Sequence, residues 1–282
     1  ADRQRRAAPP IGVAARARLA GASSSRFALY GELGDALRAT RRALQGFASI
    51  DDRRNAAAQR LDLGVMLLRI GDHHHGEAEI RQAIDELQGL GLGSNAAVGR
   101  VWLGVAALRS GRPAQAQALL EGAIAELADT GVALTRSWAL AALISLHLRA
   151  GAAAEADAYL QQLQAIVRSA PPMWSQAAAL GAEVRLAQGR LAEALDAAKN
   201  ALQIWREGVP SAERAVRGLV VLAEVQAACG HRDEARAAAD QGLAMAAQIR
   251  RSLQDPQLED CFDASDEVVR LHRVAARMLS IT

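Results

Sequence analysis

Three consecutive histidines, His73, His74 and His75, have the most obvious potential for chemistry in this sequence. Imidazole nitrogens bind transition metals, but ligands on a helix need a spacing of about four residues, or a loop geometry that further ligands complete. Adjacent histidines point in different directions, and no cysteine or acidic residue stands at a ligand spacing from them. We therefore expect an exposed polar turn between two helices and no metal site.

Other residues that could do chemistry also lack the pattern that catalysis needs. Neither cysteine stands in a motif that would activate a thiol, and no G-x-S-x-G motif is present. The glycine-rich residues 89–95 have no strand before them and no Lys-Ser or Lys-Thr pair after them, so they predict a turn and not a phosphate loop. The carboxylates of Glu259-Asp260 and Asp266-Glu267 are adjacent and project from different angles of a helix. We predict that this chain is not an enzyme and binds no cofactor.

Glycines recur at a period of about 40 residues, and this period identifies the elements that position every other residue. A small residue follows each of them five positions later, and amphipathic helical stretches lie on both sides. These turn glycines are Gly31, Gly71, Gly111, Gly151, Gly189 and Gly230. A period of this length predicts an array of stacked helical units, each of which buries its apolar face against its neighbours.

The third unit shows how each repeat is expected to be built. Its first helix is predicted over about residues 95–110, because apolar residues recur there at helical spacing: Val98, Val101, Trp102, Val105 and Leu108. Gly111 then provides the left-handed conformation that ends a helix. Pro113 suits the first turn of the next helix, which is expected to run to about Ala128. Each unit is therefore predicted to be an antiparallel helix pair.

These features resemble the tetratricopeptide repeat. The resemblance rests on the pairs Leu63-Gly64 and Leu103-Gly104, on the turn Gly-Asp or Gly-Arg, and on the later Ala and Ala-Leu positions. It covers six helix pairs, although the period of about 40 residues exceeds the usual length of about 34 and aliphatic residues replace most family aromatics. Longer units of this kind resemble the repeat tails of bacterial multidomain signalling proteins, such as Ser/Thr kinases and large ATP-binding regulators. The resemblance implies an all-α, right-handed superhelical solenoid of six antiparallel helix pairs with a C-terminal capping helix.

Three regions are expected along the chain: a linker or N-terminal arm at 1–16, the six repeats at 17–251 and the cap at 252–282. Asp255-Pro256 breaks the last repeat helix, and Phe262 is expected to anchor the cap. The final helix carries an apolar face of Val268, Leu271, Ala275, Met278 and Leu279. The arginines of the arm suit a linker from an upstream domain or a weak contact with an anionic surface. Because the chain starts without Met, we expect it to be a processed or excised part of a longer protein.

Composition argues against several classes of function. Hydrophobic residues make up 51% of the chain and aromatic residues 3%, so the interior is expected to consist of Ala, Leu, Val and Ile. The net charge is only +2 and no basic stripe with interleaved aromatics is present, so we expect no nucleic-acid partner. No apolar run reaches the ~18–20 residues that cross a bilayer, so we expect no membrane partner. Two cysteines are too few for a disulfide framework, which predicts a cytoplasmic protein.

The resemblance also implies that the first helix of each pair lines a concave groove. By register, the partner-binding residues are expected to be Leu61, Asp62, Val65, Arg69, Val101, Trp102, Val105, Arg109, Trp138 and Arg149. Later units add Ala142, Ser145, Gln176, Leu180, Glu183, Arg217, Val221 and Glu224. Alternatively, the valines pack on neighbouring helices, and the arginines at the helix ends meet the C-terminal helix dipole.

An apolar wall with Trp and Arg at its edges suits an amphipathic helix or an extended apolar segment. The sequence thus favours a non-catalytic module that binds a peptide or helix of a protein partner, as the sensor or scaffold region of a bacterial signalling protein. Two alternatives remain open. One is a self-association or autoregulatory unit of a larger kinase or transcription regulator. The other is a sensor that binds a small ligand inside the superhelix.

Overall fold

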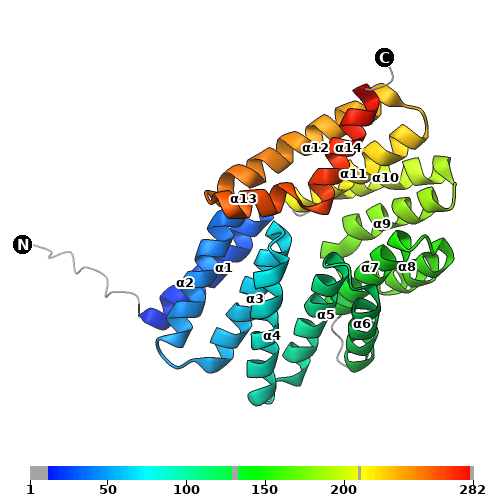
Figure 1. Ribbon diagram of the computed structural model, residues 1–282. Coiled ribbons are helices and arrows are strands. Elements are labelled where there is room, and N and C mark those ends of the chain that lie inside the picture. The colour runs from blue at the N-terminus through cyan, green and yellow to red at the C-terminus, as the bar shows by residue number, and fades with distance from the viewer. Residues whose placement is uncertain (1–11, 129–132, 209–210, 280–282) are drawn as a thin grey trace, which may run out of the picture.

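The computed structural model describes residues 12–128, 133–208 and 211–279, and within them the chain is all α-helical apart from one 3-10 turn. Six antiparallel pairs follow one another and two further helices complete the chain (Figure 1). The helices are α1 (Val13–Leu29), α2 (Leu33–Ala48), α3 (Arg53–Ile70), α4 (His73–Gly89), α5 (Gly93–Arg109), α6 (Pro113–Glu126), α7 (Ala133–Arg149), α8 (Ala153–Val167), η1 (Pro171–Met173), α9 (Trp174–Ala187), α10 (Leu191–Glu207), α11 (Ala212–Ala228), α12 (Arg232–Leu253), α13 (Pro256–Asp263) and α14 (Asp266–Leu279). The predicted fold class is confirmed.

The turn glycines end the first helix of every pair, as their period predicts. All six have a left-handed φ, from 71° to 102°, a conformation that is costly for residues with a Cβ. Gly71 shows the geometry: its N–H donates to the Leu67 carbonyl at 3.1 Å. Asp72 then caps α4 by accepting a hydrogen bond from the N–H of His75 at 3.2 Å. The chain therefore reverses within two residues.

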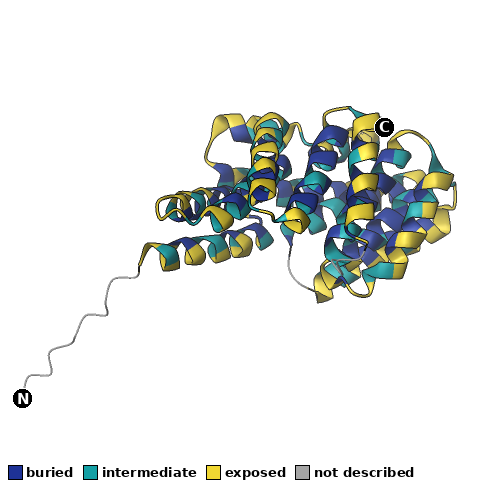
Figure 2. Ribbon diagram, turned by 90° about the horizontal axis from the view of Figure 1, so that it is seen from below, coloured by how far each residue is buried: buried dark blue, intermediate teal, exposed yellow. Residues whose placement is uncertain are grey.

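Small residues before and after the turn let the two helices of the second pair cross closely. A Cβ on Gly64 of α3 would lie 2.6 Å from Cγ1 of Ile80, and a Cβ on Gly76 of α4 would lie 3.0 Å from the Gly64 carbonyl oxygen. Side chains elsewhere on the crossing faces are mostly Ala, Leu, Val and Ile, and they are buried where helices meet (Figure 2). The core therefore has the aliphatic composition that the sequence predicts.

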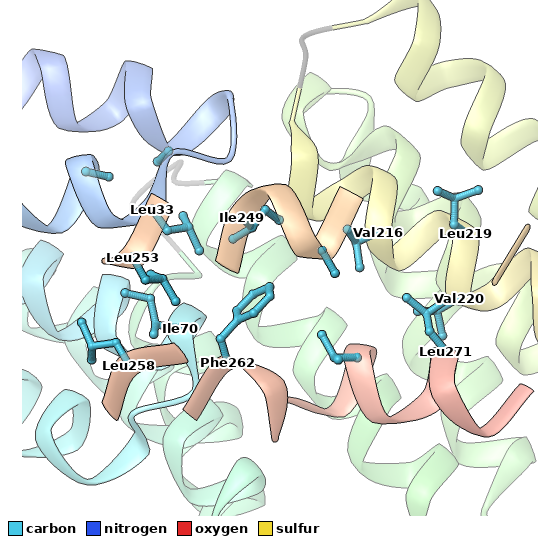
Figure 3. Packing of buried hydrophobic residues seen from close by; sticks show 14 of the residues in the cluster. Leu33, Ile70, Val216, Leu219, Val220, Ile249, Leu253, Leu258, Phe262 and Leu271 are labelled. Carbon is cyan, nitrogen blue, oxygen red and sulfur yellow. The ribbon is translucent and has the colours of Figure 1, made fainter. Parts of the chain in front are cut away.

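The C-terminal segment joins the two ends of the array. α12 packs on α2 and α13 packs on α3, while α14 lies against α11 and α12. One apolar cluster contains residues from both ends, and Figure 3 shows Leu33 and Ile70 of the first two repeats beside Leu253, Leu258 and Phe262. The single capping helix expected from the sequence is thus two helices, and α13 closes the array onto its own beginning.

Polar contacts also join the two ends of the array. The N–H of Gly34 donates to Oγ of Ser252 at 3.2 Å, and Nη1 of Arg38 donates to the Leu253 carbonyl at 3.3 Å. Nε of Arg69, on α3, donates to a carboxylate oxygen of Glu213, on α11, at 2.8 Å. The last repeat is therefore bonded to the first two by hydrogen bonds and an ion pair as well as by apolar packing.

At the N-terminus, α1 begins at Val13 and so includes Arg16, which the sequence assigned to the arm. The rest of the arm, residues 1–11, lies outside the described residues. In the part of the chain that the structure describes, no helix combines the length and the apolar character needed to cross a membrane.

The closure depends on the absence of a side chain at position 34. A Cβ on Gly34 would overlap the carbonyl of Ser252. We predict that Gly34→Ala lowers the free energy of unfolding by about 1–3 kcal/mol, because backbone atoms on both sides must move apart. Urea unfolding followed by circular dichroism measures this.

Gly122→Ala is the matched control, because a Cβ there meets nothing within 4 Å inside helix α6. Alanine at that site should raise the free energy of unfolding by about 0.5–1 kcal/mol. Equal unfolding midpoints for Gly34→Ala and the unchanged protein would contradict a tight junction between α2 and α12.

Candidate functional site

The closed array encloses a cavity of about 1210 Å³ on its concave side. The first helices of all six pairs, α1, α3, α5, α7, α9 and α11, contribute to its lining, and so do α13 and α14. The assignment of the first helices to the concave face is therefore correct. Closure onto α13 makes this space a partly enclosed cavity where the sequence predicted an open groove.

Most of the predicted groove residues line this cavity. They are Asp62, Val65, Arg69, Trp102, Val105, Arg109, Trp138 and Arg149, and the later units add Ala142, Ser145, Gln176, Glu183, Arg217 and Glu224. The placement of Leu61 and Val101 in the groove is wrong, since these side chains are 7% and 0% exposed and pack between helices. Each stands one residue before a cavity residue and so lies about 100° around the helix from it. Leu180 and Val221 are buried between helices in the same way.

One wall of the cavity is apolar and aromatic. Trp102 of α5 and Trp138 of α7 are half-buried, and their rings lie 5.2 Å apart at 50° to each other. Val65 and Val105 lie on the same wall at equivalent positions of α3 and α5. Such a wall gives a ligand apolar area to bury without any change in the backbone.

Another part of the lining, the charged wall, is a network of ion pairs around Glu183 of α9. Glu183 accepts hydrogen bonds from Arg217 of α11 at 3.0 Å and from Arg270 of α14 at 2.7 Å, and Arg270 also donates to Glu224 at 2.9 Å. Burial opposes ionisation of Glu183, but the charges of Arg217 and Arg270 outweigh it and hold its pKa below the ordinary value. The ion pairs also hold α14 against the cavity.

Two other cavity arginines have protein partners. Nη1 of Arg109 donates to the Leu68 carbonyl, in the last turn of α3, at 2.6 Å. This is the helix-terminus role that the sequence left open as an alternative to ligand contact. Arg149 lies 3.5 Å from a carboxylate oxygen of Asp266, at the start of α14. The cavity contribution of α14, through Asp266, Glu267 and Arg270, was not predicted.

Asp62 differs from the other cavity carboxylates. Its side chain lines the cavity and is exposed to the water within it. The carboxylate accepts a hydrogen bond from Nε2 of Gln59 at 2.9 Å. Among the described residues it forms no ion pair. Enclosure raises its pKa to about 6, although the hydrogen bond from Gln59 acts in the opposite direction.

The histidine triplet begins helix α4. His74 and His75 are exposed, as expected, but His73 is half-buried and lines the cavity, so the exposed-turn prediction is wrong for this residue. Burial and the charge of Arg109 lower the pKa of His73. In the described segments, no group of three or more His, Cys, Asp and Glu residues is placed to hold a metal ion.

No family model matches this sequence, and no curated protein matches it. Among solved structures, a Rap protein complexed with competence and sporulation factor has a TM-score of 0.67 at 13% identity, over 95% of this chain and 77% of that one. The Rap conjugation gene regulator of plasmid pLS20, in complex with the Phr* peptide, has a TM-score of 0.65 at 15% identity, over 93% and 74%. These likenesses show a fold like that of tetratricopeptide repeats.

A signal transduction ATPase with numerous domains and a tetratricopeptide repeat sensor, from Pyrococcus horikoshii, has a TM-score of 0.52 at 13% identity. The match covers 86% of this chain and 40% of that one. The APC/C hetero-tetramer Cut9-Hcn1 has a TM-score of 0.54 at 14% identity, over 93% of this chain. This chain spans about half of that structure's chain, at 55%.

Replacing Asp62 should stabilise the protein in a pH-dependent way. Its pKa rises from 3.8 to about 6 on folding, so the folded state binds the proton more tightly and stability falls as the pH rises through this range. We predict that Asp62→Asn raises the free energy of unfolding by about 1 kcal/mol above pH 6, a value reduced for the water that reaches the side chain.

Unfolding curves at pH 7.5 and pH 4 provide the measurement, with Asp85→Asn on the exposed face of α4 as the matched control. The difference between Asp62→Asn and the unchanged protein should disappear at pH 4. A stabilisation of the same size at both pH values would show that the charge of Asp62 is not its cause.

Removing Arg270 should destabilise the charged wall. Arg270→Gln leaves Glu183 with one cationic partner in place of two, and we predict a loss of about 2–3 kcal/mol in the free energy of unfolding at pH 7. Because the pKa of Glu183 lies below its ordinary value of 4.5, this loss should shrink as the pH falls below 4.5. Urea unfolding checks both statements.

The control is Arg236→Gln, which breaks an exposed pair with Asp240 on α12 and should cost less than about 0.5 kcal/mol. If both substitutions had the same small effect, the pairs of Arg270 would not stabilise the fold.

Proposed function

We propose that this chain is a non-catalytic module that binds a peptide or helical segment of a protein partner in its concave cavity. The observation that carries the proposal is the cavity itself. Its volume of about 1210 Å³ exceeds the usual range of small-molecule sites, about 300–1,000 Å³, and it is lined by every repeat. A ligand that spans the cavity can contact several repeats at once.

The two walls suit a ligand with an apolar side and a polar side. The apolar wall provides Trp102, Trp138 and the cavity valines, and aromatic side chains are frequent anchors of binding energy. The charged wall provides carboxylates and guanidinium groups whose positions are set by Glu183 and Arg270. Groups held in place in this way lose little entropy when a ligand binds, which favours specific recognition.

The likeness to the Rap structures supports the proposal at the level of the fold, since those structures contain a peptide or factor and share the helical array. We further propose a sensor or scaffold role in a cytoplasmic bacterial signalling protein; the likeness to a signal transduction ATPase with a repeat sensor supports the sensor part at the level of the fold. Both roles are proposals for this chain.

Filling the cavity should block binding without unfolding the protein. Ser145 lines the cavity and is half-buried, so Ser145→Trp places a large ring in that space. We predict that peptides selected from a displayed random heptapeptide library bind this variant at least about tenfold more weakly than the unchanged protein, because the ring occupies their volume. Fluorescence polarisation with labelled peptides measures the affinity.

Gln203→Trp adds the same ring on the exposed face of α10 and is the matched control. Equal affinity of the selected peptides for the protein and Ser145→Trp, with unchanged circular dichroism, would contradict binding in the cavity. A failure to select any peptide would overturn the peptide-binding proposal. Concentration-dependent light scattering then tests self-association, and a metabolite panel tests small-ligand sensing.

A further inference from the structure

Asp62 is the cavity carboxylate whose placement the fold does not explain. Glu183 and Glu224 are paired with arginines, and Glu213 is paired with Arg69. Asp62 has only a neutral partner, Gln59, in the described structure. Its carboxylate is exposed to the cavity water, and a carboxylate that has no cation of the protein beside it can pair with a cation of a ligand.

The repeat relates the position of Asp62 to that of one of the two cavity tryptophans. Asp62 in α3 and Trp102 in α5 stand at equivalent positions, about 40 residues apart, on neighbouring first helices. Trp138 comes from the next first helix, α7, and its ring contacts that of Trp102. All three side chains line the same cavity. One carboxylate and two indole rings, from three successive first helices, therefore line one cavity.

This combination is the chemistry that recognises an organic cation. A cation near the face of an indole ring is attracted by the ring's electron density, and the attraction increases where water is excluded. A neighbouring carboxylate adds a charge-assisted hydrogen bond to an ammonium or guanidinium group. Among the described residues, no arginine of the protein is paired with Asp62 or placed over either ring, so the position is open to a cation from a ligand.

We propose that Asp62, Trp102 and Trp138 form a subsite for one basic side chain, Lys or Arg, of a bound peptide. The inference rests on the proposed peptide binding and specifies its ligand. The aliphatic stem of the basic residue packs on the indole rings, and its charged end reaches Asp62 with Gln59 holding the carboxylate. An acidic residue of the peptide at the same place is repelled by Asp62, so the subsite favours basic over acidic residues.

Peptide selection tests the subsite directly. The displayed random heptapeptide library is selected in parallel on the unchanged protein, on Asp62→Asn and on the matched control Asp85→Asn. We expect Lys or Arg to be enriched at one position with the unchanged protein and with Asp85→Asn, and this enrichment to disappear with Asp62→Asn. Replacing that basic residue by norleucine should weaken binding to the unchanged protein by roughly tenfold, and binding to Asp62→Asn clearly less, because only the indole rings attract the cation there.

The outcomes separate this inference from the proposed function. Peptides that are enriched without any basic residue, and that Ser145→Trp excludes, would support cavity binding and overturn the cation subsite. Basic enrichment that persists with Asp62→Asn would also overturn it. The absence of any selected peptide would overturn both proposals.

Tryptophan fluorescence gives an independent reading of the position. Replacing Trp174, which is exposed, and Trp205 with Phe leaves the cavity pair as the only tryptophans. The selected basic peptide should change the emission of this variant, and its norleucine analogue should change it less at equal occupancy. N-acetyl-arginine amide is the free-cation probe: if it bound as tightly as the peptide, the subsite would serve a small cation and its assignment to a peptide would be overturned.

Discussion

The contact between the sixth repeat and the first two repeats decides what kind of space the array encloses. An open solenoid exposes its concave face along its whole length. Here Ser252 and Leu253 at the end of α12 meet Gly34 and Arg38 of α2, so the beginning and end of the array are joined. The junction is apolar within and polar at its edge, and it requires a glycine at position 34. The cavity exists because this junction forms.

Most of the fold could be predicted because its turns and helix pairs depend on residues close together in the sequence. The remaining contacts could not be predicted because they join residues that no repeat pattern relates. The glycine period predicts turns, helix pairs and close crossings because each depends on residues within one unit. The junction brings Gly71 and Cys261 together, which are far apart in sequence and share no pattern. Within the site, register predicted Trp102 and Asp62 but misplaced their neighbours. Successive residues are rotated by about 100° around a helix axis. A pattern of valine and leucine therefore does not show which residues at the edge of the apolar face are buried.

The cavity carboxylates show how the same enclosure has opposite consequences. Glu183 and Asp62 both lie where water is restricted, which penalises charge. Two arginines reverse the penalty for Glu183, so its pKa falls, whereas the pKa of Asp62 rises to about 6. Arg217 of α11 and Arg270 of α14 together provide this difference. The sequence did not predict the contacts of the acidic pair at the start of α14, because the partners of this helix come from repeats that the pattern does not connect to it.

Closure and binding are consequently linked. A ligand that contacts both the α3–α7 wall and α14 binds only where both are in place, so it stabilises the closed array and the closed array strengthens its binding. At a ligand concentration of about 100 times Kd, this stabilisation amounts to about 2.7 kcal/mol. That is comparable with the change of about 1–3 kcal/mol expected for Gly34→Ala at the junction. In the proposed function, a ligand between the α3–α7 wall and α14 therefore adds to the apolar cluster, hydrogen bonds and ion pair that already close the array.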